Sequence, residues 1–258
     1  MLRTLLNALH DVDRACKALG ITYWIDSETL LGAVRSGSPI PSDDDVDICM
    51  LPRDIGRFVE HAPALLGPAY TVQTPQDDPA ITSTVKVYVN GTHAPSLFHE
   101  VHDLPRPVND GLFLNIMVVS AASEFAFVRR IERVMARLVE TESYSAAMAR
   151  SPAVPRGRQK LKWVFVARVP RSVIRLMAGW LDSRESKRDG NLLGIPGAGL
   201  AGVVRRRVVF PLTPLRLGGL TLPGPADTDT YLRAEFGPDY MTPPEEERVN
   251  HADTVTFD

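Results

Sequence analysis

Four aspartates lie within five positions of this sequence: Asp43, Asp44, Asp45 and Asp47. Carboxylates held so close together repel one another and raise one another's pKa unless a cation neutralises them. Magnesium suits such a group, because it binds one or two protein carboxylates together with the phosphate oxygens of a substrate. The alternative is a solvated acidic loop, which is what most charge runs are.

The residues around the acids favour a metal site. The apolar run Val46–Leu51 predicts a strand, so the acids lie at the mouth of a core element. Alternate residues of a strand share a face, so Asp45 and Asp47 are expected to point the same way, and Asp43 can join them. Upstream, a strand over 21–25 leads into a helix over 27–34 that opens at Asp26 or Ser27, and Ser27 fits an N-cap role. The free amides at the start of that helix can hold phosphate, which is a nucleotidyltransferase-type layout.

Other elements must position this site, and hydrophobic periodicity predicts them. Helices are expected over residues 2–18 (ending near Gly20), 53–66, 124–149, 160–181 with a break at Pro170, and 228–235. Strands are expected over 85–89 and 112–119, and Gly- and Pro-rich connections dominate from 194 to 225. The fold class that follows is α+β, with a mixed β-sheet core, flanking helices and a helical C-terminal part. Residues 1–122 are expected to form the catalytic core, and 123–258 a helical part that completes the same domain.

Composition limits the classes of function. The chain has 258 residues, of which 44% are hydrophobic and 23% charged, as in ordinary globular proteins. Its net charge of -2 argues against general nucleic-acid binding. Two cysteines, Cys16 and Cys49, form neither a metal-binding spacing nor a disulfide framework, which favours a reducing compartment. The apolar N-terminal stretch is too short for a secretory signal, and no apolar run is long enough to span a membrane, so a cytoplasmic location is expected.

Two stretches of the sequence form recognisable motifs. The first runs Tyr-Trp-Ile-Asp-Ser-Glu-Thr-Leu-Leu-Gly-Ala-Val-Arg over 23–35 and continues as Ile-Pro-Ser-Asp-Asp-Asp-Val-Asp-Ile over 40–48. The other stretch includes Tyr231, the run Phe-Gly-Pro-Asp-Tyr-Met over 236–241, Arg248 and His251. The first stretch resembles the opening motif, and the other the closing motif, of the LicD family, which includes bacterial phosphocholine transferases and the animal fukutin-related proteins. The resemblance therefore brackets nearly the whole chain.

The resemblance implies a nucleotidyltransferase-like fold and a Mg²⁺-dependent reaction, with Mn²⁺ as the alternative metal. A phospho-alcohol such as phosphocholine would pass from a CDP-alcohol to a hydroxyl of a glycan or glycolipid, as in lipopolysaccharide biosynthesis, and CMP would be released. The acids that match the family's metal-binding positions are Asp43, Asp45 and Asp47, whereas Asp44 matches a more variable position. Asp45 or Asp47 could also accept the proton of the attacking hydroxyl. Ser27, Thr29 and Arg35 are the expected phosphate contacts, although Arg35 could equally be a structural counter-ion of the acids.

Two departures from the family pattern bear on activity. Glu28 stands where the family usually has glycine, and Asn115 stands where members often have aspartate. An amide oxygen can ligate a metal but cannot neutralise charge or act as a base. The charge or base role would then fall to another acid, for which Glu100 and Asp103 are the candidates. These departures make a non-catalytic protein that binds nucleotide or sugar a plausible alternative. Among enzymes, the alternative is a nucleotidyltransferase that releases pyrophosphate.

Two further segments each have a functional and a structural interpretation. The run His-Glu-Val-His-Asp over 99–103 is a polar loop or a substrate contact, since Pro95 and Pro105 disfavour the helix that a metal site would need. The segment 150–188 combines many Lys and Arg side chains with apolar residues. It is either a helix with a solvated basic face or an element that docks on the inner face of an anionic membrane.

Overall fold

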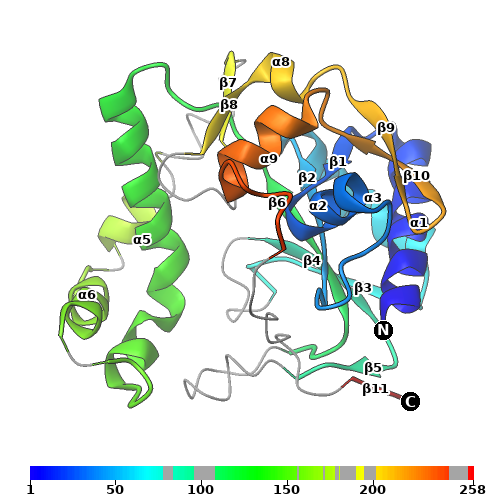
Figure 1. Cartoon of the computed structure of the whole chain (residues 1–258). Helices are drawn as coiled ribbons and strands as arrows, with labels where there is room; N and C mark the ends of the chain where they lie inside the picture. Colours follow the sequence, from blue (N-terminus) through cyan, green and yellow to red (C-terminus); the bar gives the residue numbers. More distant parts are fainter. Residues whose placement is uncertain are drawn as a thin grey trace.

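The structure of the chain is a computed structural model. The residues it describes are 1–77, 84–95, 108–155, 157–170, 172–177, 180, 190–194, 202–243 and 255–258. Helices surround a five-stranded sheet that has both parallel and antiparallel neighbours (Figure 1). The predicted α+β class is confirmed.

The central sheet positions the candidate site. Its strands are β1 (Tyr23–Ile25), β2 (Val46–Met50), β3 (Tyr70–Gln73), β4 (Val85–Val89) and β6 (Phe113–Val118). Across the sheet they follow the order β1-β2-β6-β4-β3, in which β2 and β6 run parallel and the other neighbours run antiparallel. Every residue of β2 is buried, as expected of a strand covered on both faces. The sequence did not predict β3, an edge strand in which only Gln73 is buried.

Two N-terminal helices pack against each other, and each also contacts the sheet. They are α1 (Leu2–Leu19), which contacts β6, and α3 (Pro52–Leu66), which contacts β3. α1 buries Leu5, Leu9 and Val12, which lie three or four positions apart on one helical face. It ends at Gly20, whose φ of 61° is the left-handed conformation that glycine adopts at little cost. The predicted end of this helix is therefore confirmed.

The C-terminal half returns to cover the start of the sheet. Its elements are β7 (Leu192–Gly194), β8 (Val203–Arg205), α8 (Arg206–Val209), β9 (Thr213–Leu217), β10 (Leu220–Gly224) and α9 (Thr228–Phe236). β10 packs on β1, while β9 and α9 pack on α2 (Ser27–Arg35). The Trp24 ring meets the Phe210 ring edge-on with centroids 5.7 Å apart, and its Nε1 donates to the Tyr231 hydroxyl at 3.4 Å. Residues from both halves of the chain therefore share one buried core.

The β9–β10 hairpin corrects the expectation that connections dominate residues 194–225. Its two-residue turn is Gly218–Gly219, and both glycines have positive φ, 55° and 90°. Such a turn matches the twist of antiparallel strands, so the Gly-Gly pair was a hairpin signal that the sequence analysis did not use. The C-terminal part is thus not purely helical, and the boundary after residue 122 stays a prediction.

A helical arm lies beside the core in Figure 1 and consists of α5 (Ala126–Arg150) packed on α6 (Arg158–Val166). Residues 172–177 are also helical, and the predicted break at Pro170 is confirmed. Leu161 and Phe165 are 68% and 67% exposed, so an apolar strip of α6 is uncovered. Docking of segment 150–188 on a membrane stays a prediction. None of the helices in the described part of the chain is long and apolar enough to cross a bilayer.

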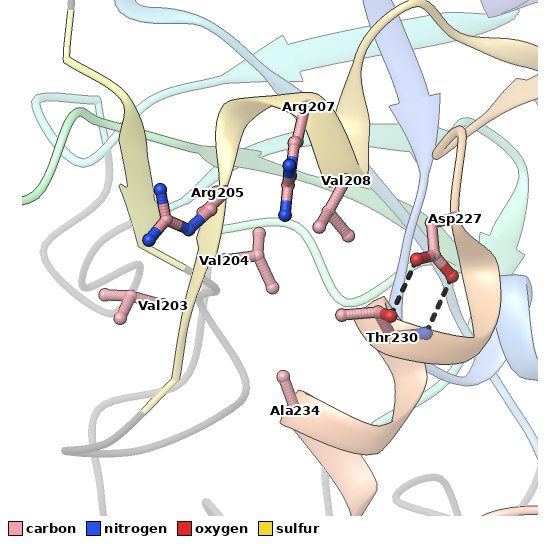
Figure 2. Close-up of a pocket in the computed structure, with 8 residues that line it drawn as sticks. All are labelled: Val203, Val204, Arg205, Arg207, Val208, Asp227, Thr230 and Ala234. Carbon is pink, nitrogen blue, oxygen red and sulfur yellow. Dashed lines mark hydrogen bonds between the residues drawn. The ribbon is translucent and has the colours of Figure 1, made fainter.

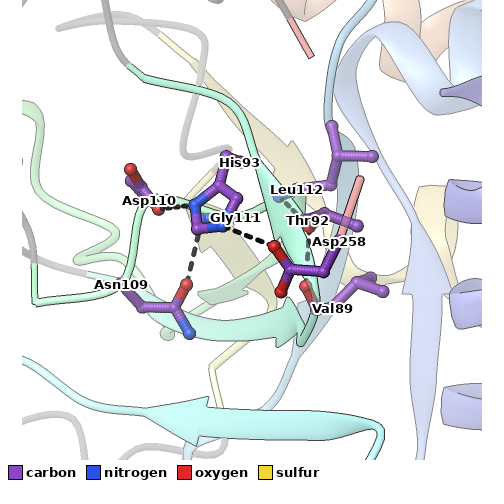
Figure 3. A network of polar contacts seen from close by, with 8 residues as sticks. All are labelled: Val89, Thr92, His93, Asn109, Asp110, Gly111, Leu112 and Asp258. Carbon is purple, nitrogen blue, oxygen red and sulfur yellow. Dashed lines mark hydrogen bonds and ion pairs between the residues drawn. The ribbon is translucent and has the colours of Figure 1, made fainter. Parts of the chain in front are cut away.

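A short pairing between β5 (Thr92–His93) and β11 (Thr256–Phe257) holds the last described residues beside the sheet (Figure 3). The His93 ring lies between two carboxylates, with Nδ1 2.9 Å from Asp110 and Nε2 3.1 Å from Asp258. These hydrogen bonds, that to Asp110 first, raise the pKa of His93 because they favour the charged imidazolium. Thr92 connects β5 to the sheet, since its hydroxyl donates to the Val89 carbonyl and accepts from the amide of Leu112.

Candidate functional site

Asp43, Asp44 and Asp45 lie in the connection from α2 to β2, and Asp47 is the second residue of β2, as the sequence predicts. The turn before them is closed by a hydrogen bond from the Asp43 amide to the Ile40 carbonyl. Carboxylate oxygens of Asp43, Asp44 and Asp45 all lie within 4.8 Å of one another. Asp44, which sequence reasoning set aside as variable, is therefore part of the cluster and is 7% exposed. Three converging carboxylates are an oxygen-ligand set of the type that Mg²⁺ prefers.

Asp47 joins the cluster through Asn115 rather than directly. Asn115 lies opposite Asp47 on the parallel neighbour β6, so both side chains leave the same face of the sheet. The amide nitrogen of Asn115 donates to Asp45 Oδ2 at 2.9 Å and to Asp47 Oδ1 at 3.2 Å. Asn115 thus occupies the position of a third strand acid and acts as a hydrogen-bond donor there. The stand-ins that the sequence analysis named, Glu100 and Asp103, lie outside the described residues.

The row of side chains continues along the same face of the sheet. Lys86 on β4 is the antiparallel partner of Asn115, and Gln73 on β3 is the partner of Lys86. The Lys86 ammonium lies 3.2 Å from the centroid of the Phe113 ring, a cation–π geometry. A lysine therefore lies one strand beyond the Asp47–Asn115 pair, where it can approach a phosphate held at the acids.

The start of α2 is fixed to β2 by two hydrogen bonds. The Asp26 amide donates to the Asp47 carbonyl, and the Asp47 amide donates to Thr29 Oγ1, both at 3.0 Å. The helix N-terminus thus lies beside the acids, as the nucleotidyltransferase layout requires. Thr29 is buried and its hydroxyl already accepts this bond, so the structure gives it a positioning role.

Ser27 is not the N-cap that the sequence suggested. The N-cap is Asp26, and Ser27 is the first helical residue, with a φ of 50° that non-glycine residues rarely adopt. The Ser27 hydroxyl donates to the Glu28 carboxylate at 2.6 Å. Glu28, which stands where the family usually has glycine, therefore has the Ser27 hydroxyl as one hydrogen-bond partner.

Burial and mutual repulsion perturb the acids. The pKa of Asp43 is raised from 3.8 to about 8, first by burial and then by the charges of Asp45, Glu28 and Asp44. Burial also raises the pKa of Asp47 well above its usual range, with Asp45 and Asp26 adding to the effect. Perturbed carboxylates gathered in this way are typical of functional sites, and a bound cation would relieve the repulsion.

Two further acids lie next to the site, although the sequence analysis did not assign them to it. Asp26 is fully buried and accepts a hydrogen bond from Cys49 Sγ at 3.0 Å. Glu235 comes from α9, and its pKa is raised from 4.5 to about 9 by burial and then by the charge of Asp26. Asp26 lay within the first matched motif and could have been noticed. Glu235 is more than 200 positions away along the chain, and its only sequence signal is that it lies within the closing motif, directly before the run 236–241.

Arg35 does not contact the acids through its described hydrogen bonds. Its guanidinium donates to the backbone carbonyls of Tyr240 and Thr242. The first motif is therefore tied to the closing motif by a side chain that the sequence predicted to bind phosphate. That phosphate contact stays a prediction. Of the closing motif, Arg248 and His251 lie outside the described residues, as does the run 99–103.

Residues 20–91 match the family model described as LicD/FKTN/FKRP, nucleotidyltransferase domain. The chain carries a LicD-family domain. The matched segment includes α2 and all four clustered aspartates but ends before Asn115 and Glu235. The family supports a phosphotransferase-type role in general, and the nucleotidyltransferase-like fold prediction is confirmed.

Two curated relatives match part of the chain. An uncharacterized protein of Rickettsia typhi is 36% identical over 70 residues, which is 27% of this chain and 23% of the relative. An uncharacterized protein of Rickettsia prowazekii is 38% identical over 69 residues, which is 27% of this chain and 26% of the relative. The similarity thus spans about a quarter of this chain and about a quarter of each relative.

Proposed function

We propose that the chain is a metal-dependent phosphotransferase that moves a phospho-alcohol from a CDP-activated donor to a glycan or glycolipid hydroxyl and releases CMP. The observation that carries the proposal is the convergence of the Asp43, Asp44 and Asp45 carboxylates at the start of a buried strand. The family match supports the phosphotransferase class. The choice of a CDP-alcohol donor rests on the LicD resemblance.

The donor set fits Mg²⁺ or Mn²⁺. Asp43, Asp45 and Asp47 are the proposed ligands, with Asp44 close enough to contribute an oxygen. Burial and repulsion raise the pKa values of Asp43 and Asp47, which is the electrostatic situation that a divalent cation stabilises. When bound, the metal would neutralise the charge that develops on the transferred phosphoryl group.

The chain's own residues would do the rest. The N-terminus of α2, with Ser27, would face the diphosphate of the donor with free amides. Asn115 fixes the Asp45 and Asp47 carboxylates relative to each other through its two hydrogen bonds. Asp45 is the less buried of the pair and would accept the proton of the attacking hydroxyl through a carboxylate oxygen that the metal leaves free. Lys86 would approach the departing phosphate along the sheet.

The test is transfer activity in Asp45→Asn and Asp47→Asn. Each change keeps the side-chain shape but removes a charge, and each should lower CMP release by at least about 100-fold, the scale of a lost general base or charge-stabilising group. Glu60→Gln, on an exposed part of α3, is the matched control and should stay active. Full activity in both aspartate variants would refute the site assignment.

Product analysis separates the enzymatic alternatives. Purified protein would be given a panel of CDP-alcohols and nucleoside triphosphates with Mg²⁺. CMP release identifies phospho-alcohol transfer, whereas pyrophosphate release identifies nucleotidyl transfer. Metal-independent binding of nucleotide without any turnover would identify the non-catalytic alternative.

A further inference from the structure

A cavity lies between β8, α8 and α9, and none of the clustered aspartates lines it (Figure 2). Its volume is about 520 Å³. This is within the range of roughly 300–1,000 Å³ that is typical of small-molecule pockets. Nothing in the proposed reaction uses this cavity.

The cavity has an apolar floor. Val204 and Val208 are 4% and 8% exposed and belong to the buried core, and Val203 and Ala234 complete the floor. The floor is therefore formed by the packing of β8, α8 and α9 against one another. It offers contact to a carbon skeleton rather than to a bare ion.

Two arginines supply positive charge at the cavity. Arg205 and Arg207 line it from β8 and α8, and both are exposed (Figure 2). Neither makes an ion pair within the part of the chain that the structure describes. Their neighbour Arg206 differs, since its guanidinium lies 4.9 Å from the centroid of the Phe210 ring.

The acidic residue that lines the cavity, Asp227, already accepts hydrogen bonds within the protein. Asp227 caps α9, with one carboxylate oxygen accepting from the Thr230 amide at 3.0 Å and the other from the Thr230 hydroxyl at 2.7 Å. These bonds appear as dashed lines in Figure 2. The cavity is thus lined by two arginines and by one acid that already satisfies a helix N-terminus, so the net charge of its lining is positive.

The cavity is separate from the metal site because the two use different faces of α9. Thr230 and Ala234 line the cavity, and residues four apart share a helical face. Tyr231 and Glu235, each one position further on, face Trp24 and Asp26 instead. A ligand in the cavity would therefore contact a different face of α9 from the one that carries Glu235.

We propose that this cavity binds a phosphate ester, with Arg205 and Arg207 holding the phosphate and the valine floor contacting the carbon skeleton. Guanidinium groups suit this task because their planar array of donors matches phosphate oxygens. The ester can come from a phosphorylated sugar or from a phospholipid headgroup, which present the same chemistry to the arginines.

The test is calorimetry on the whole chain at low salt in EDTA, so that metal at the acidic cluster contributes nothing. The probes are inorganic phosphate, glucose 1-phosphate and monomeric dihexanoyl phosphatidylglycerol. At least one ester should bind more tightly than inorganic phosphate, because only the esters can use the floor. Which ester binds distinguishes the sugar source from the lipid source.

Arg205→Gln combined with Arg207→Gln should weaken ester binding at least about tenfold, the loss expected for charge-assisted hydrogen bonds. Arg216→Gln, at an exposed position of β9, removes the same kind of charge and should change the affinity less than twofold or so. Asp45→Asn should leave the affinity unchanged, which separates this proposal from the proposed catalytic function. The proposal is overturned if no ester binds, if the double variant binds like the unmodified chain, or if inorganic phosphate binds as tightly as both esters.

Discussion

Asn115→Asp is the substitution that examines the candidate metal site most directly. Asn115 on β6 donates one hydrogen bond to Asp47 on the neighbouring strand β2 and another to Asp45, just before that strand. Aspartate has nearly the same shape, but it loses both donors and adds a third carboxylate to the pair. The substitution therefore leaves packing almost unchanged and alters the electrostatics of the site.

The expected cost follows from those two bonds. A hydrogen bond to a charged group contributes about 1.5–3 kcal/mol, and the half-buried position of Asn115 favours the lower value. Loss of both bonds then costs roughly 3 kcal/mol in the metal-free protein. For a chain of this size each kcal/mol shifts Tm by about 2–4 °C, so Tm in EDTA should fall by roughly 6–12 °C.

Magnesium should reverse this loss. The additional carboxylate increases the negative charge available to a cation, so Mg²⁺ should raise the Tm of Asn115→Asp more than that of the unmodified chain. A metal at about 100 times its Kd stabilises the folded state by about 2.7 kcal/mol, which is comparable to the loss.

The assay is thermal unfolding followed by circular dichroism, in EDTA and in MgCl₂ at matched ionic strength. Asn7→Asp is the matched control, because Asn7 is exposed on α1 and far from the acids in the sequence. It should change neither Tm nor the response to Mg²⁺ appreciably. Equal Mg²⁺ responses in Asn115→Asp and the unmodified chain would refute the role given to this position.

Two further predictions concern the stability of the same region. A Cβ at Gly32 would lie 2.6 Å from the Ser38 carbonyl oxygen, so Gly32→Ala should lower the free energy of unfolding by about 1–3 kcal/mol and displace the loop that leads to the acids. At Gly56 a Cβ would have no atom within 4 Å, so Gly56→Ala should raise the free energy of unfolding by about 0.5–1 kcal/mol. Equal urea midpoints for the two variants would contradict the packing at Gly32. Metal-free protein should lose stability as pH rises from about 4 to about 9, because the raised pKa values of Asp43 (about 8) and Glu235 (about 9) mean that the folded state keeps protons that the unfolded state has released. Urea midpoints measured across this range should fall without Mg²⁺ and fall less with it, and midpoints that rise with pH in EDTA would contradict the assigned protonation.

The sequence predicted the elements around the acids because their signals are local. Hydrophobic periodicity marked α1 through its buried Leu5, Leu9 and Val12, and an apolar run marked β2. The acids themselves were visible as a short run at the start of that strand. Each of these signals lies within fewer than about 20 consecutive residues, which is the range in which periodicity can be recognised.

The parts that sequence reasoning missed depend on contacts between distant segments. Glu235 enters the site only because α9 packs on α2, and no spacing rule relates it to Asp26. Arg35 has the residue type of a phosphate ligand, yet the fold directs it to the carbonyls of the closing segment. Ser27 has the residue type of an N-cap, but the pairing of Asp26 with Asp47 moves the cap back by one position.

Because residues of the C-terminal half pack on β1, the folding of this strand during synthesis depends on residues that are made late. Trp24 is fully buried, and the hydroxyl that its indole contacts belongs to a residue 207 positions later. At about 5–20 residues per second, a ribosome needs roughly 10–40 s to make the chain between them. Throughout that interval the growing chain must carry an uncovered tryptophan and an uncapped sheet edge, so folding of the site residues is completed only when nearly all of the described chain has been made.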